Sequence, residues 1–354
     1  MLRQAQHDET LSFGHPELVE GFSNSIKKKH MKSTFLIYIL VILYPFSTIV
    51  KGQAPNIGSA SSFALFTVDG AFSNTGNATL VTGDAGTNIG AFTAFPTGTI
   101  VGQIHVADAI STQTAIDVTS AYNDLKSRIG GSVISTTLEG QHLLPGLYKL
   151  GAASSLNGDL VIDGGGDPDA LFIIQIDGAL LVGASIISTI TLINKADASN
   201  VYWQINGQFE LGASSVFRGT ILANGAIDLL EGSTLLGKGL SVAGAIFLHN
   251  NIVTTYPLAT GTITGTANVC QSQTSVTYSV PTITNASDYI WTLPSGATII
   301  SGNNTNTITV DYGASAVDGT ITVQGSNACG LGIISANYIV KVNPVTLTSA
   351  IYHY

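Results

Sequence analysis

One short unit recurs six times in this chain: a glycine followed by large apolar residues two and four positions later. The copies begin at Gly70, Gly146, Gly178, Gly207, Gly225 and Gly244. Only the first copy departs from the pattern, with Asn74 in its last place. The last three glycines are 18 and 19 residues apart, which is typical of the coils of a β-solenoid. Stacked coils produce a flat face of short strands, and we expect a face of small polar residues to be the working surface.

Composition and charge exclude one class of partner. Charged residues make up only 10% of the chain, whereas glycine accounts for 39 of its 354 residues. From residue 55 onward there are 18 acidic and 7 basic residues. A nucleic acid would need clustered Lys and Arg side chains against its phosphates. We therefore expect no nucleic-acid partner. We also expect no cofactor and no metal ion.

The amino terminus has the order of an export signal. Lysines at 27–29 precede an apolar run over 35–50, and small residues at 52 and 54 offer a cleavage site. We predict a signal peptide over 31–54, cleaved after Ala54, and hence a secreted protein. Residues 1–30 would then be a spurious upstream extension. A transmembrane anchor is the alternative, although a proline interrupts the run and its length is marginal.

Both cysteines, Cys270 and Cys329, lie in the carboxy-terminal part of the chain. In an exported protein an isolated pair within one module favours a disulfide, which we predict here. Two buried free thiols are the alternative. The only histidine in that module is His353 at the tail, so we expect neither cysteine to act as a nucleophile.

The hydrophobic period changes between Val106 and Ile129. Apolar residues there recur at helical spacing, and Gly130-Gly131 ends the pattern. We predict one amphipathic helix of about 22 residues that lies along a solenoid face, because the repeat occurs on both sides of it. A helix that joins two domains is the alternative.

The composition changes again after the last repeat. We assign 55–258 to the solenoid and the Thr- and Gly-rich stretch 259–267 to a linker. Period-two alternation with regular turn signals over 268–344 predicts a β-sandwich, with Trp291 as its core aromatic. Residues 345–354 form a tail without a terminal element, as expected of a truncated chain.

Several stretches in a fixed order carry a resemblance to a known family. They are Leu65–Asp84, Gly102–Asp108, Ala121–Leu125, Leu144–Tyr148, Gly166–Ile173, Asn200–Ile205 and Phe217–Ala223. Through them, residues 56–255 resemble the ice-binding-like domain of secreted microbial proteins. The resemblance implies a right-handed discontinuous β-helix with an α-helix packed alongside, and ice as the ligand.

The carboxy-terminal segment carries a second resemblance, over residues 262–343. Cys270 and the stretches Val276–Pro281, Tyr289–Gly296 and Gly319–Gly330 are similar to the polycystic-kidney-disease-like (PKD-like) repeat, an immunoglobulin-like sandwich. Such repeats usually act as spacers. The whole chain is therefore expected to be all-β with one long helix.

An ice-binding face needs a regular flat array of hydroxyl and methyl groups. Successive coils lie about 4.7–4.9 Å apart, so one hydroxyl per coil forms a row with this regular spacing. Strongly active family members are similar in carrying Thr-small-x-Thr or Thr-small-x-Asn at the corner after the unit. The corresponding corners here supply our candidate ice-facing residues: Thr75, Asn77, Thr79, Ser154, Ser185, Ser214, Ser215, Ser233, Thr234 and Asn250. Serine replaces most of the threonines and Glu231 adds a charge, so we expect weak or moderate activity.

Two other readings of the solenoid stay open. The small corner residues also suit tight turns on structural grounds alone. A cell-surface adhesin or matrix protein without ice activity would need the same flat polar face on a stalk. Its partner would be a cell surface or a glycan. In all these cases we expect a monomer.

An enzyme is the less favoured class. Parallel β-helices also host polysaccharide-active enzymes, which need clustered carboxylates with a base or calcium. The candidates are Asp163, Asp167 and Asp169 on one loop, or Arg218 and Lys238 near Asp228. The three aspartates are explained as residues of a turn, and Arg218 and Lys238 as part of a solvated face. We therefore predict no catalytic residues.

Overall fold

The computed structural model describes residues 52–93, 97–258 and 260–345. The predicted upstream extension and almost all of the predicted signal peptide lie outside the described residues, as does nearly all of the predicted tail. Among the described residues, no helix combines the length and the apolar character needed to cross a membrane. The predicted class, all-β with one long helix, is confirmed.

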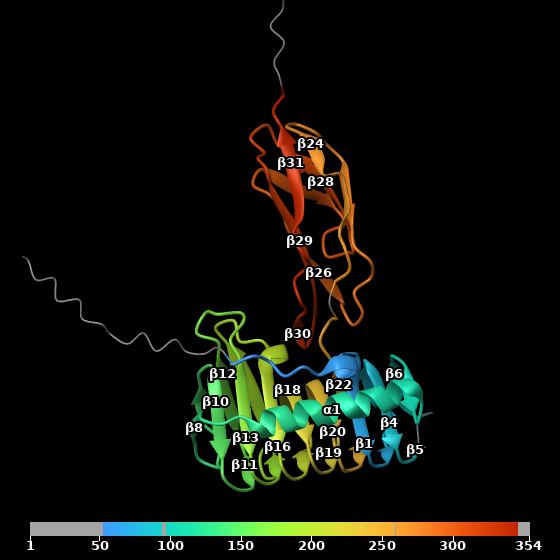
Figure 1. The fold of residues 1–354 in the computed structure, drawn as a ribbon, viewed down its shortest axis with the longest axis vertical. Coiled ribbons are helices and arrows are strands. Elements are labelled where there is room, and N and C mark those ends of the chain that lie inside the picture. The colour runs from blue at the N-terminus through green and yellow to red at the C-terminus, as the bar shows by residue number, and fades with distance from the viewer. Residues whose placement is uncertain (1–51, 94–96, 259, 346–354) are drawn as a thin grey trace, which may run out of the picture. The chain divides into compact units, whose positions relative to one another are not determined.

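The first part of the chain is a β-solenoid whose coils have three faces, and all strand pairs in it are parallel (Figure 1). Face 1 contains β8 (Ser132–Val133), β10 (Gly146–Leu150), β13 (Phe172–Ile176), β16 (Val201–Ile205), the second halves of β18 (Val216–Ala223) and β20 (Thr234–Ser241), β1 (Phe63–Asp69), β4 (Asp84–Ile89) and β7 (Ile104–Val106).

Face 2 is a separate seven-stranded sheet of β11 (Ser154–Leu156), β14 (Leu180–Val182), β17 (Phe209–Leu211), β19 (Ile227–Leu229), β21 (Ile246–Leu248), β2 (Phe72–Asn74) and β5 (Phe92–Thr93). Face 3 contains β9 (His142–Leu143), β12 (Asp159–Asp163), β15 (Thr189–Ile193), the first halves of β18 and β20, β22 (Ile252–Thr254), β3 (Leu80–Thr82) and β6 (Thr99–Val101).

The coils do not stack in sequence order. The first coil pairs with the last one, as Leu65 opposite Gly239, Phe72 opposite Ile246 and Leu80 opposite Ile252 show. In Figure 1 the blue strands therefore lie beside the orange ones, and the green strands begin at the other end of the stack. The helix α1 (Ala109–Ser127) returns the chain to that end. Its 19 residues span about 28 Å, the width of about six strand spacings.

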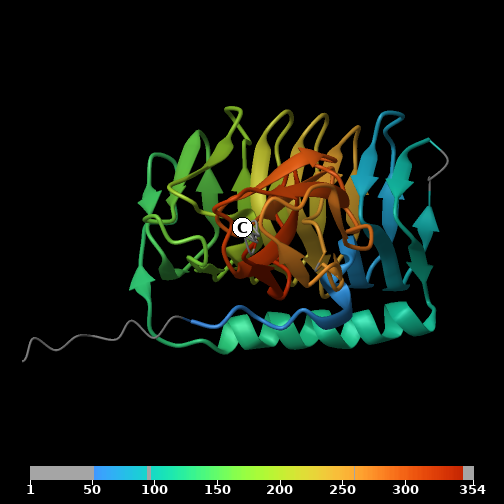
Figure 2. The same ribbon diagram turned by 90° about the horizontal axis from the view of Figure 1, so that it is seen from above.

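The helix α1 covers face 1, as predicted (Figure 2). The Asp108 side chain accepts a hydrogen bond from the Ser111 backbone N–H, and the Ser111 hydroxyl caps the start of the helix in return. Its apolar side packs against outward residues of face 1 in one buried cluster: Val118, Ala121 and Leu125 with Phe66, Ile173, Leu222 and Leu240. The short 3-10 turn η1 (Gly58–Ser61), ahead of β1, is tied to α1 where Ser59 Oγ donates to Asp117 Oδ2 at 2.6 Å.

The core runs along the inside of the coils. Trp203, Phe209 and Phe217 are fully buried, and the ring centroid of Phe217 lies 4.9 Å from that of Trp203 and 4.8 Å from that of Phe209. Five of the six predicted units are strands of face 2, but the copy at Gly146 is β10 in face 1. The strands β13 and β16 are wholly buried, and the loop before β16 contains the 3-10 turn η2 (Ala198–Asn200).

The carboxy-terminal part is a sandwich of mainly antiparallel strands. One sheet orders β23 (Thr264–Gly265), β25 (Val276–Ser279), β28 (Thr307–Tyr312) and β27 (Ala297–Ser301). The other contains β24 (Asn268–Cys270), β31 (Tyr338–Asn343), β29 (Gly319–Asn327), β26 (Asp288–Thr292) and β30 (Gly330–Leu331). The strand β23 falls within the predicted linker, so the sandwich begins earlier than predicted. Tyr278 and Tyr312 fill its core with hydroxyls 2.7 Å apart, whereas Trp291 is only partly buried.

The predicted disulfide is wrong, since Cys270 and Cys329 are both free thiols. Cys270 pairs with Asn343 in β31, whose Val340 lies opposite Gly319 at the start of β29. Cys329 instead follows the end of β29 at Asn327. The length of this strand is about 26 Å, whereas a disulfide needs Cα atoms within about 7 Å. Cys329 is buried, which raises the pKa of its thiol well above the usual value.

Candidate ligand-binding face

Face 2 presents one outward side chain per strand. Its three-residue strands alternate buried, outward and buried positions, because successive side chains point to opposite sides of a sheet. The outward residues lie in register about 4.8 Å apart. In stacking order they are Ser155, Leu181, Glu210, Asp228, Phe247, Ser73 and Thr93.

A row of alanines runs beside these outward residues. It lies one position before each strand and contains Ala153, Ala179, Gln208, Ala226, Ala245, Ala71 and Ala91. Backbone hydrogen bonds from each strand to the next coil's member of the row fix its alignment, for example Phe209 N to Ala226 O at 2.8 Å. A glycine precedes most members. A Cβ on Gly225 would lie 2.8 Å from Gly207 C, so these corners approach too closely for a larger residue.

Charge is concentrated at the middle of face 2. Glu210 lies directly opposite Asp228, and the His249 Nε2 atom is 3.4 Å from Asp228 Oδ1. Phe247 beside them is 37% exposed. The uncharged hydroxyl residues Ser73 and Thr93 lie on the coils towards one end of the face, and Ser155 lies at the other. The face is therefore regular in spacing and mixed in chemistry.

Half of the hydroxyl and amide residues at the corner between faces 2 and 3 are buried. Ser188, Ser215, Ser233, Asn251 and Thr79 form this inner row, each 0–2% exposed. Ser188 N donates to Ser215 Oγ, and Asn251 Nδ2 donates to Ser233 Oγ and to Leu230 O. The inner row thus satisfies backbone groups where the coil turns.

Four of the predicted ice-facing residues are consequently inaccessible. Thr79, Ser215 and Ser233 belong to the inner row, and Ser154 is an inward residue of β11 opposite Leu180. The prediction was wrong for Ser154 because the Gly146 unit lies in face 1, which shifts its following residues into a strand of face 2.

The other predicted residues are accessible but do not form one row. Thr75, Asn77, Ser185 and Ser214 are exposed at the corner, Ser155 is outward on face 2, and Asn250 is half-buried. Thr234 is outward on face 3 instead, opposite Val216 and Ile252. Thr75 Oγ1 lies 2.7 Å from His249 Nδ1, and Asn250 Nδ2 donates to Glu231 Oε1 at 2.7 Å. Several of these polar groups therefore already have protein partners.

The structure separates the residues considered for catalysis. Asp228 is on face 2, whereas Lys238 is buried behind face 1 and donates to Ser61 O, Phe63 O and Thr255 Oγ1. Burial lowers the pKa of Lys238 to about 7. Arg218 donates to Ile190 O. These groups hold the coils together and do not converge on a common space.

The loop carboxylates are also turn residues. Asp163 accepts from Gly165 N, Asn194 Nδ2 and His142 Nε2, and these hydrogen bonds, that of Gly165 above all, hold the pKa of Asp163 below its usual value. Asp167 Oδ1 accepts from Asp169 N. Within the part of the chain that the structure describes, no three His, Cys, Asp or Glu side chains are grouped to hold a metal ion.

Sequence reasoning missed the alanine row. A signal was present, since alanine follows the glycine of the unit at Ala71, Ala179, Ala226 and Ala245. A seventh copy, Gly90-Ala-Phe-Thr93, was also missed because a small residue occupies its last apolar place. Only the pairing of β5 with β2 shows that it extends the same face.

Comparison with known proteins places both parts of the chain. The ice-binding-like family model matches residues 67–254, slightly more than half of the chain, and the PKD-like domain model matches residues 256–339. An ice-binding protein of Nostoc sp. (strain HG1) is 34% identical over 222 residues, which are 62% of this chain and 81% of that protein.

Solved structures agree with this assignment. An ice-binding protein from the Antarctic ascomycete Antarctomyces psychrotrophicus is 35% identical with a TM-score of 0.54, covering 57% of this chain and 98% of that one. An ice-binding protein from an Antarctic biological consortium is 37% identical with a TM-score of 0.53, covering 57% and 91%. The repeat, the discontinuous stack and the covering helix therefore have one explanation: this chain belongs to the ice-binding-like family.

Proposed function

We propose that this protein binds ice through face 2. The observation that carries the proposal is the pair of aligned rows on this face, each repeated at the strand spacing on seven coils. One row consists of outward residues, and the other has alanine on six coils and Gln208 on the seventh. Ice offers no pocket and each contact with it is weak, so a flat repeated surface is the geometry that can sum many contacts. The names of the similar proteins support the same ligand.

The pattern Thr-small-x-Thr, which we expected at the corners, fits the strands of face 2 better than it fits the corners. A small residue in second place and an outward residue in fourth place occur in Gly70-Ala-Phe-Ser73 and Gly90-Ala-Phe-Thr93. Here glycine stands in the first place, and the fourth place is Ser or Thr on only three coils. Glu210 and Asp228 hold their own hydration water, so we expect weak or moderate activity.

A bulky residue in the alanine row tests the proposal. Ala226 is half-buried at the middle of face 2, and a tyrosine there would lift neighbouring contacts off the crystal. We expect Ala226→Tyr to raise the concentration needed for ice recrystallisation inhibition at least about tenfold, a loss of about 1.4 kcal/mol. The assay uses purified protein without the predicted signal peptide, with far-UV circular dichroism as a check on folding.

Ser120→Tyr is the matched control, because Ser120 is exposed on α1, away from face 2. Its activity should equal that of the unsubstituted protein. If the unsubstituted protein is inactive at micromolar concentration, or if both variants behave alike, the ice proposal fails. An adhesin with the same flat face would then be the better account.

The remaining parts fit a secreted binding protein. We propose export with cleavage after Ala54, a PKD-like sandwich that acts as a spacer, and a monomer that carries out no covalent chemistry. Amino-terminal sequencing of secreted protein that begins at Met1 or Met31 would contradict the export proposal.

A further inference from the structure

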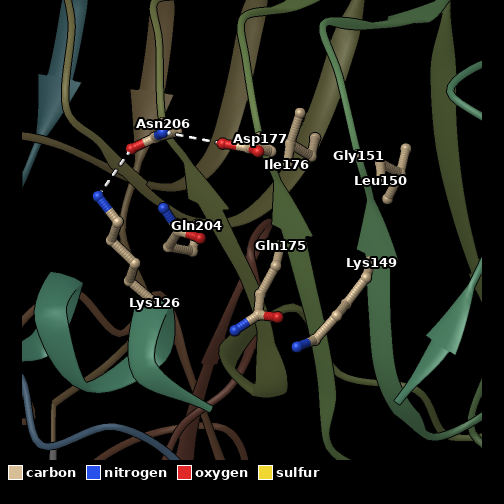
Figure 3. A pocket seen from close by; sticks show the side chains of 9 residues that line it. All are labelled: Lys126, Lys149, Leu150, Gly151, Gln175, Ile176, Asp177, Gln204 and Asn206. Carbon is tan, nitrogen blue, oxygen red and sulfur yellow. Dashed lines mark hydrogen bonds between the residues drawn. The ribbon is translucent and has the colours of Figure 1, made fainter. Parts of the chain in front are cut away.

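A polar pocket lies where α1 ends over face 1. Its volume is about 310 Å³, and Figure 3 shows the lining side chains: Lys126 from the helix, Lys149, Gln175 and Gln204 from adjacent strands, and Asp177 and Asn206 at the strand ends. None of these residues has a part in the ice proposal.

Register explains why this part of face 1 is polar. Lys149, Gln175 and Gln204 lie directly opposite one another on β10, β13 and β16, and the next residue of the row, Leu222, packs in the cluster beneath the helix. The row therefore changes from apolar to polar where the helix ends. Gln175 Nε2 donates to Leu125 O and to Arg128 O, which fixes the last turn of α1 beside the pocket.

Two nitrogen donors in the pocket lack partners within the described part of the chain. Gln204 is 4% exposed, and its Nε2 atom is buried without a hydrogen bond. The Gln204 side chain lies beside the Tyr122 hydroxyl, and that hydroxyl donates to Asn206 Oδ1 at 2.8 Å. Among the described residues, the Lys149 ammonium likewise makes no hydrogen bond or ion pair. An unpartnered buried amide is costly, and a ligand that accepts from it would remove that cost.

The charges in the pocket define the ligand class. Lys126, Lys149 and Asp177 give it a net charge of +1, which favours a single negative charge over a dianionic phosphate. The side-chain amides and Asp177 suit hydroxyl groups, whereas the Leu150 and Ile176 side chains are buried in the core and offer no apolar contact. A volume near 300 Å³ is at the lower end for small-molecule sites.

We propose that this pocket binds a carboxylate-bearing sugar, such as one hexuronate unit. The carboxylate would lie between Lys149 and Lys126, and the ring hydroxyls would face the Gln175, Gln204 and Asp177 side chains. Lys126 Nζ now donates to Asn206 Oδ1 at 3.1 Å. If the Lys126 ammonium turned towards the ligand, the buried Gln204 amide would become accessible to it.

Titration with D-glucuronate, followed by amide chemical shifts in the full protein from residue 55, tests the site. We expect shifts on β10, β13, β16 and the end of α1 with a Kd of about 1 mM, and none with D-glucose. Lys149→Gln should weaken binding about tenfold, equal to about 1.4 kcal/mol. Lys195→Gln is the matched control, since Lys195 is exposed on a loop outside the pocket.

Three outcomes would overturn the proposal. The first is no shift at 20 times the expected Kd, and the second is equal binding of glucose. The third is a tighter response to inorganic phosphate than to glucuronate. Unchanged chemical shifts of the strands of face 2, which carry no part of the pocket, show in the same spectra that the solenoid of each variant is folded.

Discussion

Faces 2 and 3 are built by the same stacking of coils, yet they present different chemistry. The outward row at the start of face 3 contains Asp159, Thr189, Val216, Thr234, Ile252, Leu80 and Thr99, so charge is confined to one end of it. The outward row of face 2 has Glu210 and Asp228 at its centre. Regular spacing therefore follows from the solenoid, whereas suitability for ice depends on the outward residues.

The two faces also differ in flatness. Six strands of face 2 have three residues, and an alanine row lies beside them. Face 3 alternates Thr with the larger Ile252 and Leu80, and its strands β18 and β20 turn the corner into face 1. The small residues of the alanine row favour face 2, although Leu181, Glu210 and Phe247 make its outward row uneven. The uncharged centre of the outward row favours face 3. We give the alanine row more weight, because small side chains let a rigid crystal surface approach the coils closely.

The largest expected effect is the difference between a tyrosine substitution on face 2 and one on face 3. Ala226→Tyr on face 2 should lower ice recrystallisation inhibition at least about tenfold, and Thr234→Tyr on face 3 should change it less than about twofold. Both tyrosines would stand at the middle of a face, so their bulk is matched. The reverse result would move the ice site to face 3.

Buried and exposed corner residues should differ in stability. Asn251 is fully buried and hydrogen-bonded through both ends of its amide, whereas Asn77 is exposed at the next coil's corner. We expect Asn251→Ala to lower the free energy of unfolding by about 2–3 kcal/mol and Asn77→Ala by less than about 0.5 kcal/mol. Urea denaturation measures both, and similar losses would show that the inner row has no special structural role.

The buried amine of Lys238 lies at the corner from face 3 to face 1, so the free energy of unfolding of the protein should depend on pH. Burial lowers the pKa of Lys238 from 10.5 to about 7, so above pH 7 the unfolded chain binds one proton more than the folded protein. The free energy of unfolding should therefore rise between pH 7.5 and 9, by up to about 2 kcal/mol at about 1.4 kcal/mol per unit.

Lys238→Met is the control for this window. It should lose the rise whatever its stability at pH 7.5, because it has no amine to titrate. The buried tyrosines have raised pKa values and act only above pH 10. The raised pKa of the Cys329 thiol lowers the free energy of unfolding above about pH 8.5 in both proteins, so the difference between their slopes isolates Lys238. Equal slopes in the two proteins would mean that Lys238 stays charged in the fold.

The smallest expected effect is a gain. Replacing both carboxylates at the centre of face 2, with Glu210→Thr and Asp228→Thr, should increase ice recrystallisation inhibition about two- to threefold, less than about 1 kcal/mol. Asp288→Thr on the sandwich removes an exposed charge of the same kind and should have no effect. A decrease in the double variant would indicate that these carboxylates contribute to binding.

The sequence by itself determined the solenoid, its covering helix and the sandwich, because each depends on a local period. The glycine unit marks short strands, the spacing of apolar residues from Val106 to Ile129 marks α1, and alternation marks the sandwich. Only the tertiary structure decided which small residues face solvent. Ser214 and Ser215 are neighbours at one corner, yet one is exposed and the other is buried, since the turn directs them to opposite sides. Stacking order likewise depends on pairings between distant segments, such as β1 with β20, which no local pattern encodes.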